Sequence, residues 1–391
     1  YKIINSISRF RFFLKLIKNI LGIRFLSNLE LKSKNLSFSK YDSIIFSWCK
    51  VTDFDDKGNY SDRYFNEYST ANKNFLWFLI SVDDKIPENI DGNIQILYRK
   101  PSSLVSKLYF VLKTVYRNIR AKNKGEFYIS HEEVFAERIT EVLKSYNDLE
   151  YITKIIQPYE GQPFQHAINI LFKDLNIKTI GYLHSLLPAL PTDLIYRFGA
   201  PDILYVHGYG QIEIMKKFLN WDSNFLRFIP SLRFRENSFS FSGCIYVPYD
   251  FINQKVILDS FEFFLKNSEF GSLPFFKIKT HPVKLNSLKH KKLIKRINFL
   301  LNKYENRFDS KIKTKISVVI GVSAVILEAL ENDVKTVIHI VNNPVLDSHQ
   351  NILWQGIDVE VLSNNVYKYQ LSNKKHYIHL GDNNLSLKKL T

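Results

Sequence analysis

The chain has 391 residues, of which 45% are hydrophobic and 15% aromatic. This composition excludes an intrinsically disordered chain, and the length predicts two domains rather than one core. The net charge of +16 favours anionic partners, such as a phosphorylated substrate, nucleic acid or anionic lipid. The sequence contains no uncharged apolar run of about 18 residues, which argues against a membrane-spanning helix. Cys49 and Cys244 lie far apart in apolar runs, which argues against a disulfide framework or a zinc site and favours a reducing, cytoplasmic compartment.

Residues 1–26 form a distinct first segment. Apolar residues recur there at helical spacing, with lysines and arginines between them. The pattern predicts a basic amphipathic helix. Such a helix either lies on an anionic membrane surface or packs its apolar side against the protein, and both readings stay open.

The first half of the chain then alternates between strand and helix patterns. Strands are expected at residues 41–48, 94–98, 153–157, 178–183 and 200–206, helices at 104–120, 132–146, 167–174 and 211–219, and a strand or helix end at 75–82. This alternation predicts a doubly wound α/β sheet.

Several of these strands end in polar side chains. His184 and Ser185 follow one strand, His207 follows the next, and Arg233 ends the segment after that. In an open α/β sheet the ligand crevice lies outside the carboxyl ends of the strands. We therefore expect His184, Ser185 and Arg233 to contact an acceptor or a sugar.

The most unusual stretch of the first half surrounds Glu160-Gly161-Gln162, directly after the strand at 153–157. A carboxylate there, beside a glycine that permits close approach, is placed to act as a general base. Gly161 and Gln162 would contact the acceptor. The alternative is that Glu160 caps the helix that follows.

A second βα series begins after a polar break at residues 236–243. It contains strands at 244–248 and 275–280, helices at 253–266 and 288–304, a strand–turn–helix–strand unit over 316–341, and a last short strand at 359–362 with a polar tail. The predicted organisation is an N-terminal acceptor-side domain at 27–240 and a C-terminal nucleotide-sugar-binding domain at 241–391. Each is expected to be Rossmann-like, with the two facing a cleft.

Two strand ends of this second series could bind an anion. Lys279 and Thr280 lead to His281-Pro282, and the strand at 316–320 leads to Gly321-Val322-Ser323. A histidine can bind phosphate as a cation or protonate a leaving group. A serine before a helix can bind an anion or simply cap the helix. We expect Lys279, Pro282, Gly321 and Ser323 to bind the phosphate of a nucleotide.

Three common classes of enzyme are disfavoured. The chain has no GxxxxGK[ST] motif for a P-loop phosphotransferase and no GxGxxG motif for a dehydrogenase. It also has no Cys/His cluster, which disfavours a metal-dependent transferase, so no metal and no cofactor is expected.

The order of these motifs resembles that of bacterial GT-B glycosyltransferases that use CMP-activated nonulosonic acids or Kdo. Bacterial sialyltransferases and polysialyltransferases carry an acidic motif ending in Gly, then a His-Pro motif, then a serine motif opening a helix. Glu160-Gly161, His281-Pro282 and Ser323 correspond to these. The stretch from Glu160 to Arg233 is also similar to surface-carbohydrate biosynthesis proteins of capsule and O-antigen loci. Tyr159 and Val322 stand where the sialyltransferase pattern usually has a second acid and a second serine.

This resemblance implies roles for the site residues. Glu160 would be the general base on the acceptor hydroxyl, or the nucleophile if configuration is retained. His281 would bind or protonate the CMP phosphate, Ser323 would hold it, and Lys279 and Arg233 would offset negative charge. The expected partners are a CMP-sugar donor, a glycan or glycolipid acceptor and, where residues 1–26 lie on a membrane, its anionic surface.

Two alternatives remain beside this reading. One is a GT-B transferase with a UDP- or dTDP-sugar donor, and the other is a non-catalytic basic protein that binds anions or glycans. The sequence contains no recognisable motif for binding DNA or RNA, so nucleic acid is not an expected partner.

Overall fold

The computed structural model describes residues 28–32, 38–83, 85–100, 136–137, 139–145, 149–185, 194–235, 240–281, 284–312, 315–321, 323–342, 356–372, 377–382 and 384–390, and positions 105, 112 and 116. Residues 1–26, Pro282 and most of the helix expected at 104–120 lie outside the described residues.

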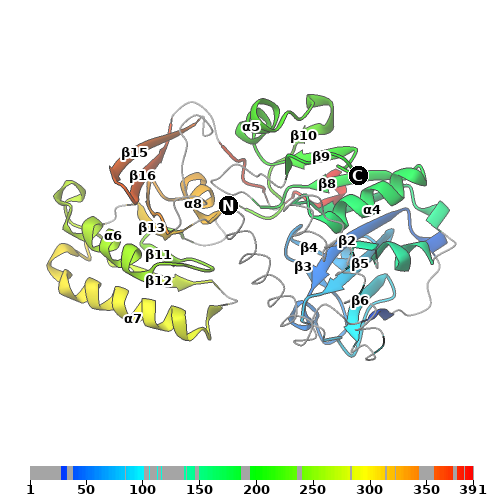
Figure 1. Ribbon diagram of the computed structural model, residues 1–391, viewed down its shortest axis with the longest axis horizontal. Coiled ribbons are helices and arrows are strands. Elements are labelled where there is room, and N and C mark those ends of the chain that lie inside the picture. The colour runs from blue at the N-terminus through cyan, green and yellow to red at the C-terminus, as the bar shows by residue number, and fades with distance from the viewer. Residues whose placement is uncertain are drawn as a thin grey trace. The chain divides into compact units, whose positions relative to one another are not determined.

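The described residues belong to two compact units (Figure 1). The first comprises the described parts of Tyr1–Tyr182, Tyr196–Leu204 and Ser386–Thr391, and the second those of Leu183–Ile195 and Tyr205–Leu385. Residues 205–240, which the sequence assigns to the N-terminal domain, belong to the second unit in this division. Parallel-rich sheets with helices confirm the expected α/β class with two units.

The larger sheet has the strand order β1-β6-β5-β2-β7-β8-β9-β10. From β6 to β8 neighbouring strands run parallel, and β1 is antiparallel to β6. Its strands are β1 (Asn28–Lys32), β2 (Ser43–Cys49), β5 (Phe75–Ser81), β6 (Ile94–Lys100), β7 (Lys154–Pro158), β8 (Lys178–Tyr182), β9 (Ile203–Val206) and β10 (Leu226–Phe228).

The core of the first unit explains why β2 and β5 read as continuous apolar runs. All seven residues of β5 are buried, as expected for a parallel strand covered on both faces. One face of these strands packs against α4 (Pro163–Asp174), where Phe46 contacts Phe78 and Phe164. A short hairpin of β3 (Ser61–Asp62) and β4 (Glu67–Tyr68) follows β2.

The sheet of the second unit has the order β12-β11-β13-β14-β16-β15. β12, β11, β13 and β14 are parallel, while β16 and β15 add an antiparallel edge. Its strands are β11 (Cys244–Val247), β12 (Lys277–Thr280), β13 (Ile316–Ile320), β14 (Thr336–Ile340), β15 (Ile357–Ser363) and β16 (Val366–Leu371). Helices α6 (Gln254–Lys266) and α7 (Leu288–Lys303) pack on one face, and α8 (Val325–Glu331) packs on the other (Figure 1). Helix α5 (Tyr209–Leu219) also belongs to this unit.

Each sheet contains one point where the strand order reverses. In the larger sheet the chain continues from β2 to β5 on one side and from β7 to β8 on the other, although β2 and β7 are neighbours. In the smaller sheet β11 is followed by β12 on one side and β13 by β14 on the other. Loops diverge at such a point and leave a crevice at the carboxyl ends of the two strands, where α/β proteins bind ligands.

Two expectations about element bounds are wrong. Helix α4 begins at Pro163 rather than at residue 167, because proline fits the first helical turn, where no N–H partner is needed. The chain does not end in one short strand and a polar tail. β15 and β16 form an antiparallel pair, and the segment after them returns to the protein with Ile378 and Leu387 fully buried.

Among the helices in the described part of the chain, none has the length and apolar character needed to cross a bilayer. Cys49 and Cys244 are both buried as free thiols.

A buried carboxylate fixes the loop that follows β2. Asp62 is 2% exposed and accepts hydrogen bonds from the Ser47 hydroxyl (2.5 Å) and the Tyr60 hydroxyl (2.6 Å). Its second oxygen accepts from the backbone N–H groups of Tyr64 (2.7 Å) and Phe65 (2.6 Å). The Ser47 hydroxyl ties this carboxylate to β2, which ends at the reversal point, and the other three donors fix the conformation of the loop itself.

We predict that Asp62→Ala lowers the free energy of unfolding by about 3 kcal/mol, because buried donors lose their acceptor. Chemical denaturation measures this loss. Asp56→Ala is the matched control, since Asp56 is an exposed acid of the same loop and its removal should change stability by less than about 0.5 kcal/mol. Equal effects of the two substitutions would contradict the structural role of Asp62.

Candidate functional site

The Glu160 turn (residues 159–162) lies at the carboxyl end of β7, beside the end of β2. The buried side chain of Gln165 fixes its backbone. Gln165 Oε1 accepts from the N–H groups of Glu160 (2.9 Å) and Gln162 (3.0 Å), and its Nε2 donates to the Pro158 carbonyl (2.6 Å). The first turn of α4 therefore ties the Glu160 turn to the end of its strand.

Glu160 itself is half-buried, and its carboxylate accepts from the Gln162 side-chain amide at 2.9 Å. Gly161 has φ +74°, a conformation that glycine adopts without strain, and His166 Nε2 binds its carbonyl at 3.1 Å. The Gln165 side chain accepts hydrogen bonds from the backbone N–H groups of this turn, while the Gln162 side chain orients the Glu160 carboxylate. The first reversal point thus carries an oriented carboxylate beside a glycine, as a general base requires.

His184, Ser185 and Arg233 belong to the second unit. Arg233 Nη1 donates to the His184 carbonyl at 3.5 Å, and Ser185 is half-buried next to His184. His207 is fully buried, and burial, helped by the nearby His184 and Arg233, lowers its pKa to about 3. His207 is therefore neutral at physiological pH and contributes to packing, whereas His184 and Arg233 lie close together.

His281, Gly321 and Ser323 all follow parallel strands of the second sheet, so they lie at its carboxyl edge. His281 is exposed. The Ser323 hydroxyl accepts from the N–H of Val325, the first residue of α8, at 3.3 Å, and this contact competes with a ligand role. Helix α8 has only seven residues, so its dipole adds little to anion binding.

Gly321 is required by its surroundings. Its φ is +74°, and a Cβ atom there would lie 3.1 Å from Pro248 Cβ and 3.5 Å from Asn342 Cβ. The turn after β13 therefore packs directly against the residue that follows β11.

The strand order places β11 between β12 and β13, so the residues after β11 lie between His281 and Ser323. This segment, which we call the β11 loop (residues 248–252), was not among the sequence-derived candidates. Tyr249 is 53% exposed, and its ring centroid is 5.1 Å from that of His281. The position of the β11 loop between the two motifs follows only from the strand order, because β11 and β13 are neighbours in the sheet but are not consecutive in the chain.

Lys279 lies on the α8 face of the sheet rather than at the tip of its strand. Its register partner is Tyr246, and Lys279 Nζ donates to the Tyr246 hydroxyl (3.4 Å) and the Ser240 carbonyl (3.3 Å). The half-buried ammonium group is therefore positioned by contacts within the unit.

Glu328 is the second residue that the sequence motifs did not single out. It is half-buried on α8, between the buried Leu327 and Ala329. Burial raises the pKa of Glu328 to about 7, although Arg233 and Lys279 both act to lower it. A carboxyl that titrates near neutrality beside two cations is a frequent feature of functional sites. The signal in the sequence was an acid with apolar residues on both sides, from Val325 to Leu330.

Comparisons with known proteins do not assign the chain to a family. No protein-family model and no curated protein matches the sequence at a significant level. Solved structures similar to it include a glycosyltransferase from Rickettsia africae, with 11% identity, a TM-score of 0.38 and coverage of 80% of this chain and 87% of that one. The N-terminal domain of trehalose-6-phosphate phosphatase from Candida albicans has 11% identity, a TM-score of 0.37 and coverage of 76% and 82%. Likeness at this level decides neither the fold family nor the activity.

We predict a pH-dependent stability that depends on Glu328. A carboxyl with a folded pKa of about 7 and an ordinary value of 4.5 binds more protons when folded. The free energy of unfolding should therefore fall as the pH rises from about 4.5 to 7. The total fall should be roughly 3 kcal/mol, because each unit of difference between the folded and unfolded pKa is worth about 1.4 kcal/mol. Denaturation at pH 5 and pH 8 should show this slope in the wild type and a weaker slope in Glu328→Gln. Glu213→Gln, at an exposed position of α5, should keep the wild-type slope, and identical slopes in all three would contradict the assignment.

Proposed function

We propose that the protein is a metal-independent glycosyltransferase that moves a nonulosonic acid or Kdo from a CMP-sugar to a surface-glycan acceptor. One observation carries the proposal. The residues that resemble catalytic motifs lie at or beside the strand-order reversals of the two sheets: Glu160 follows β7 at one, Gly321 and Ser323 follow β13 at the other, and His281 follows β12, the strand next to β11. Motifs that matched by chance would have no reason to lie at both reversal points.

The proposal assigns the acceptor to the first unit. Glu160 accepts the proton of the acceptor hydroxyl as the oxygen attacks the anomeric carbon of the donor sugar. Gly161 and Gln162 contact the acceptor, and Gln162 keeps the carboxylate oriented through its 2.9 Å hydrogen bond. In a retaining reaction the same carboxylate is the nucleophile instead.

The second unit receives the donor. As the new glycosidic bond forms, the bond between the anomeric carbon and the phosphate oxygen breaks and CMP leaves. His281 binds or protonates the departing phosphate, with Gly321 permitting close approach and Ser323 beside it. Arg233 and Lys279 supply positive charge around Glu328 in the same unit. Positive groups of this kind favour a donor that carries both a phosphate and a carboxylate.

The acceptor in this proposal is a capsule, O-antigen or lipooligosaccharide glycan, including lipid-linked forms at the cytoplasmic membrane face. The net charge of +16 supports an anionic donor and an anionic surface.

The choice of nucleotide separates this proposal from a UDP- or dTDP-sugar enzyme. We expect CMP to raise the melting temperature measurably, whereas UDP, dTDP and GDP at the same concentration have little effect, because only a bound ligand stabilises the folded state. Stabilisation by UDP or dTDP alone would move the proposal to a different donor. Strong, salt-sensitive binding to generic DNA without any nucleotide effect would favour a non-catalytic basic protein.

Glu160→Gln tests the chemistry itself. With CMP-nonulosonic acid or CMP-Kdo and oligosaccharide acceptors, release of CMP should fall by at least about 100-fold, because the substituted amide cannot accept the proton. Binding of CMP and the melting temperature should stay at wild-type values. Glu150→Gln, at an exposed position of the same unit, is the control with unchanged turnover, and wild-type turnover in Glu160→Gln would exclude its assigned role.

A further inference from the structure

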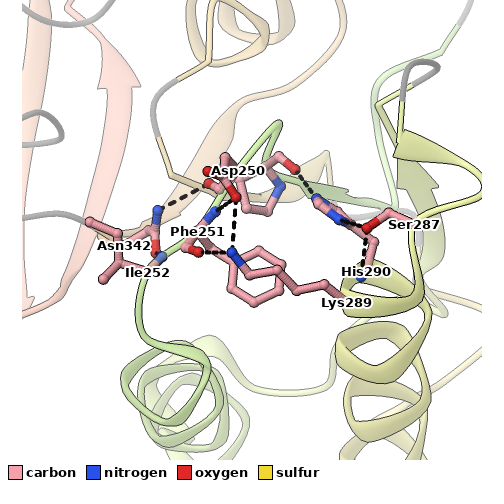
Figure 2. A network of polar contacts seen from close by, with 8 residues as sticks. Asp250, Phe251, Ile252, Ser287, Lys289, His290 and Asn342 are labelled. Carbon is pink, nitrogen blue, oxygen red and sulfur yellow. Dashed lines mark hydrogen bonds and ion pairs between the residues drawn. The ribbon is translucent and has the colours of Figure 1, made fainter. Parts of the chain in front are cut away.

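The β11 loop combines a tightly fixed backbone with an exposed aromatic side chain. Figure 2 shows the polar contacts that fix it, made by residues of α7, its N-cap and the end of β14. His290 is 2% exposed and its Nε2 donates to the Pro248 carbonyl at 3.0 Å. On the other side of Tyr249, Asn342 Nδ2 donates to the Asp250 carbonyl at 3.2 Å.

Further bonds complete this network on both sides of the loop. The Ser287 hydroxyl lies 2.9 Å from His290 Nδ1, and because Nε2 must donate to a carbonyl, the hydroxyl donates to Nδ1. Lys289 Nζ donates to Asp250 Oδ1 at 2.9 Å, and Asn342 Oδ1 accepts from the Ile252 N–H at 3.3 Å. The residues before and after Tyr249 are thus held by α7 and by Asn342, which follows β14 (Figure 2).

Tyr249 itself does not take part in the hydrophobic core. It is 53% exposed even though Lys284 Nζ lies 4.2 Å from its ring centroid and the His281 ring lies 5.1 Å away. The turn after β12 brings these two groups together, because the Lys284 N–H donates to the His281 carbonyl at 2.8 Å. An exposed aromatic ring on a rigid loop therefore lies beside two groups that can bind phosphate.

The position of this cluster indicates its ligand. The β11 loop follows the first strand at the reversal point, and Pro248 contacts Gly321 across it. A nucleotide has an aromatic face at one end and a phosphate at the other. This cluster offers an aromatic ring for the base and cationic groups for the phosphate. A simple anion would contact the cationic groups but not the exposed ring.

We propose that Tyr249 is the stacking surface for the base of the donor nucleotide, with Lys284 and His281 holding its phosphate. This inference rests on the proposed function and adds to it the residue that recognises the base. The expected gain in binding affinity comes from stacking of the base on the aromatic ring, and such stacking depends little on which base is bound. Selection among bases would then come from other contacts.

Calorimetric titration of the full chain with CMP and with ribose 5-phosphate tests the inference. Tyr249→Ala should weaken CMP binding by roughly 5-fold to 100-fold, the usual range for one stacked base. Binding of ribose 5-phosphate, which lacks the base, should change by less than about 2-fold. Tyr249→Phe, which keeps the ring, should bind CMP nearly as the wild type does.

Two further variants complete the design. Phe299→Ala removes a 68% exposed aromatic of α7 and should leave both affinities unchanged. Lys284→Ala should weaken the binding of both CMP and ribose 5-phosphate, because the substitution removes a contact to the phosphate. Unchanged CMP binding in Tyr249→Ala, or an equal loss for CMP and ribose 5-phosphate, would overturn the role in base recognition while leaving the proposed function intact. A wild type that binds no nucleotide at all would overturn the proposed function and this inference together.

Discussion

The two sheets depend on one constraint, which is that parallel strands need crossover connections that return over the faces of the sheet. Where connections from neighbouring strands leave in opposite directions, backbone cannot fill the space beyond their carboxyl ends. Glu160 and Tyr249 both lie at such places, one in each sheet. The core residues of β2, β5, β11 and β13 serve to hold these ends in register, and the chemistry depends on side chains that follow them.

Local sequence predicted much of this architecture. The β-branched run at β13 and the periodic helices α6 and α7 are each visible in a short window, and each was found. The apolar run at β5 is also visible, but its pattern left a strand and a helix end both open. Segments without a strong pattern were harder to interpret. β16 alternates between aromatic and polar residues and is partly exposed, so the sequence suggested a tail where the chain adds a strand.

The candidate site shows a different kind of limit. Glu160 and His281 could be singled out because each directly follows a strand that the sequence reveals. Tyr249 could not, because its importance comes from β11 lying between β12 and β13, and strand order is set by long-range packing. Glu328 was not singled out for a related reason, since the two cations that lower its pKa, Arg233 and Lys279, are 95 and 49 positions away in the chain (328 − 233 and 328 − 279). A short stretch of sequence shows neither the order of the strands nor which distant cations lie near a carboxyl group.

The buried Asp62 has a consequence for how the first unit can move. Swinging residues 60–65 away from β2 would break the hydrogen bond from the Ser47 hydroxyl to Asp62 and the bond from the Tyr60 hydroxyl to the Trp48 carbonyl, and the buried Asp62 carboxylate would lose its partner on the strand. Opening of this loop is therefore costly, which sets it apart from segments that open readily. Under the proposed function, any closing motion of the first unit around an acceptor would come from segments other than residues 60–65.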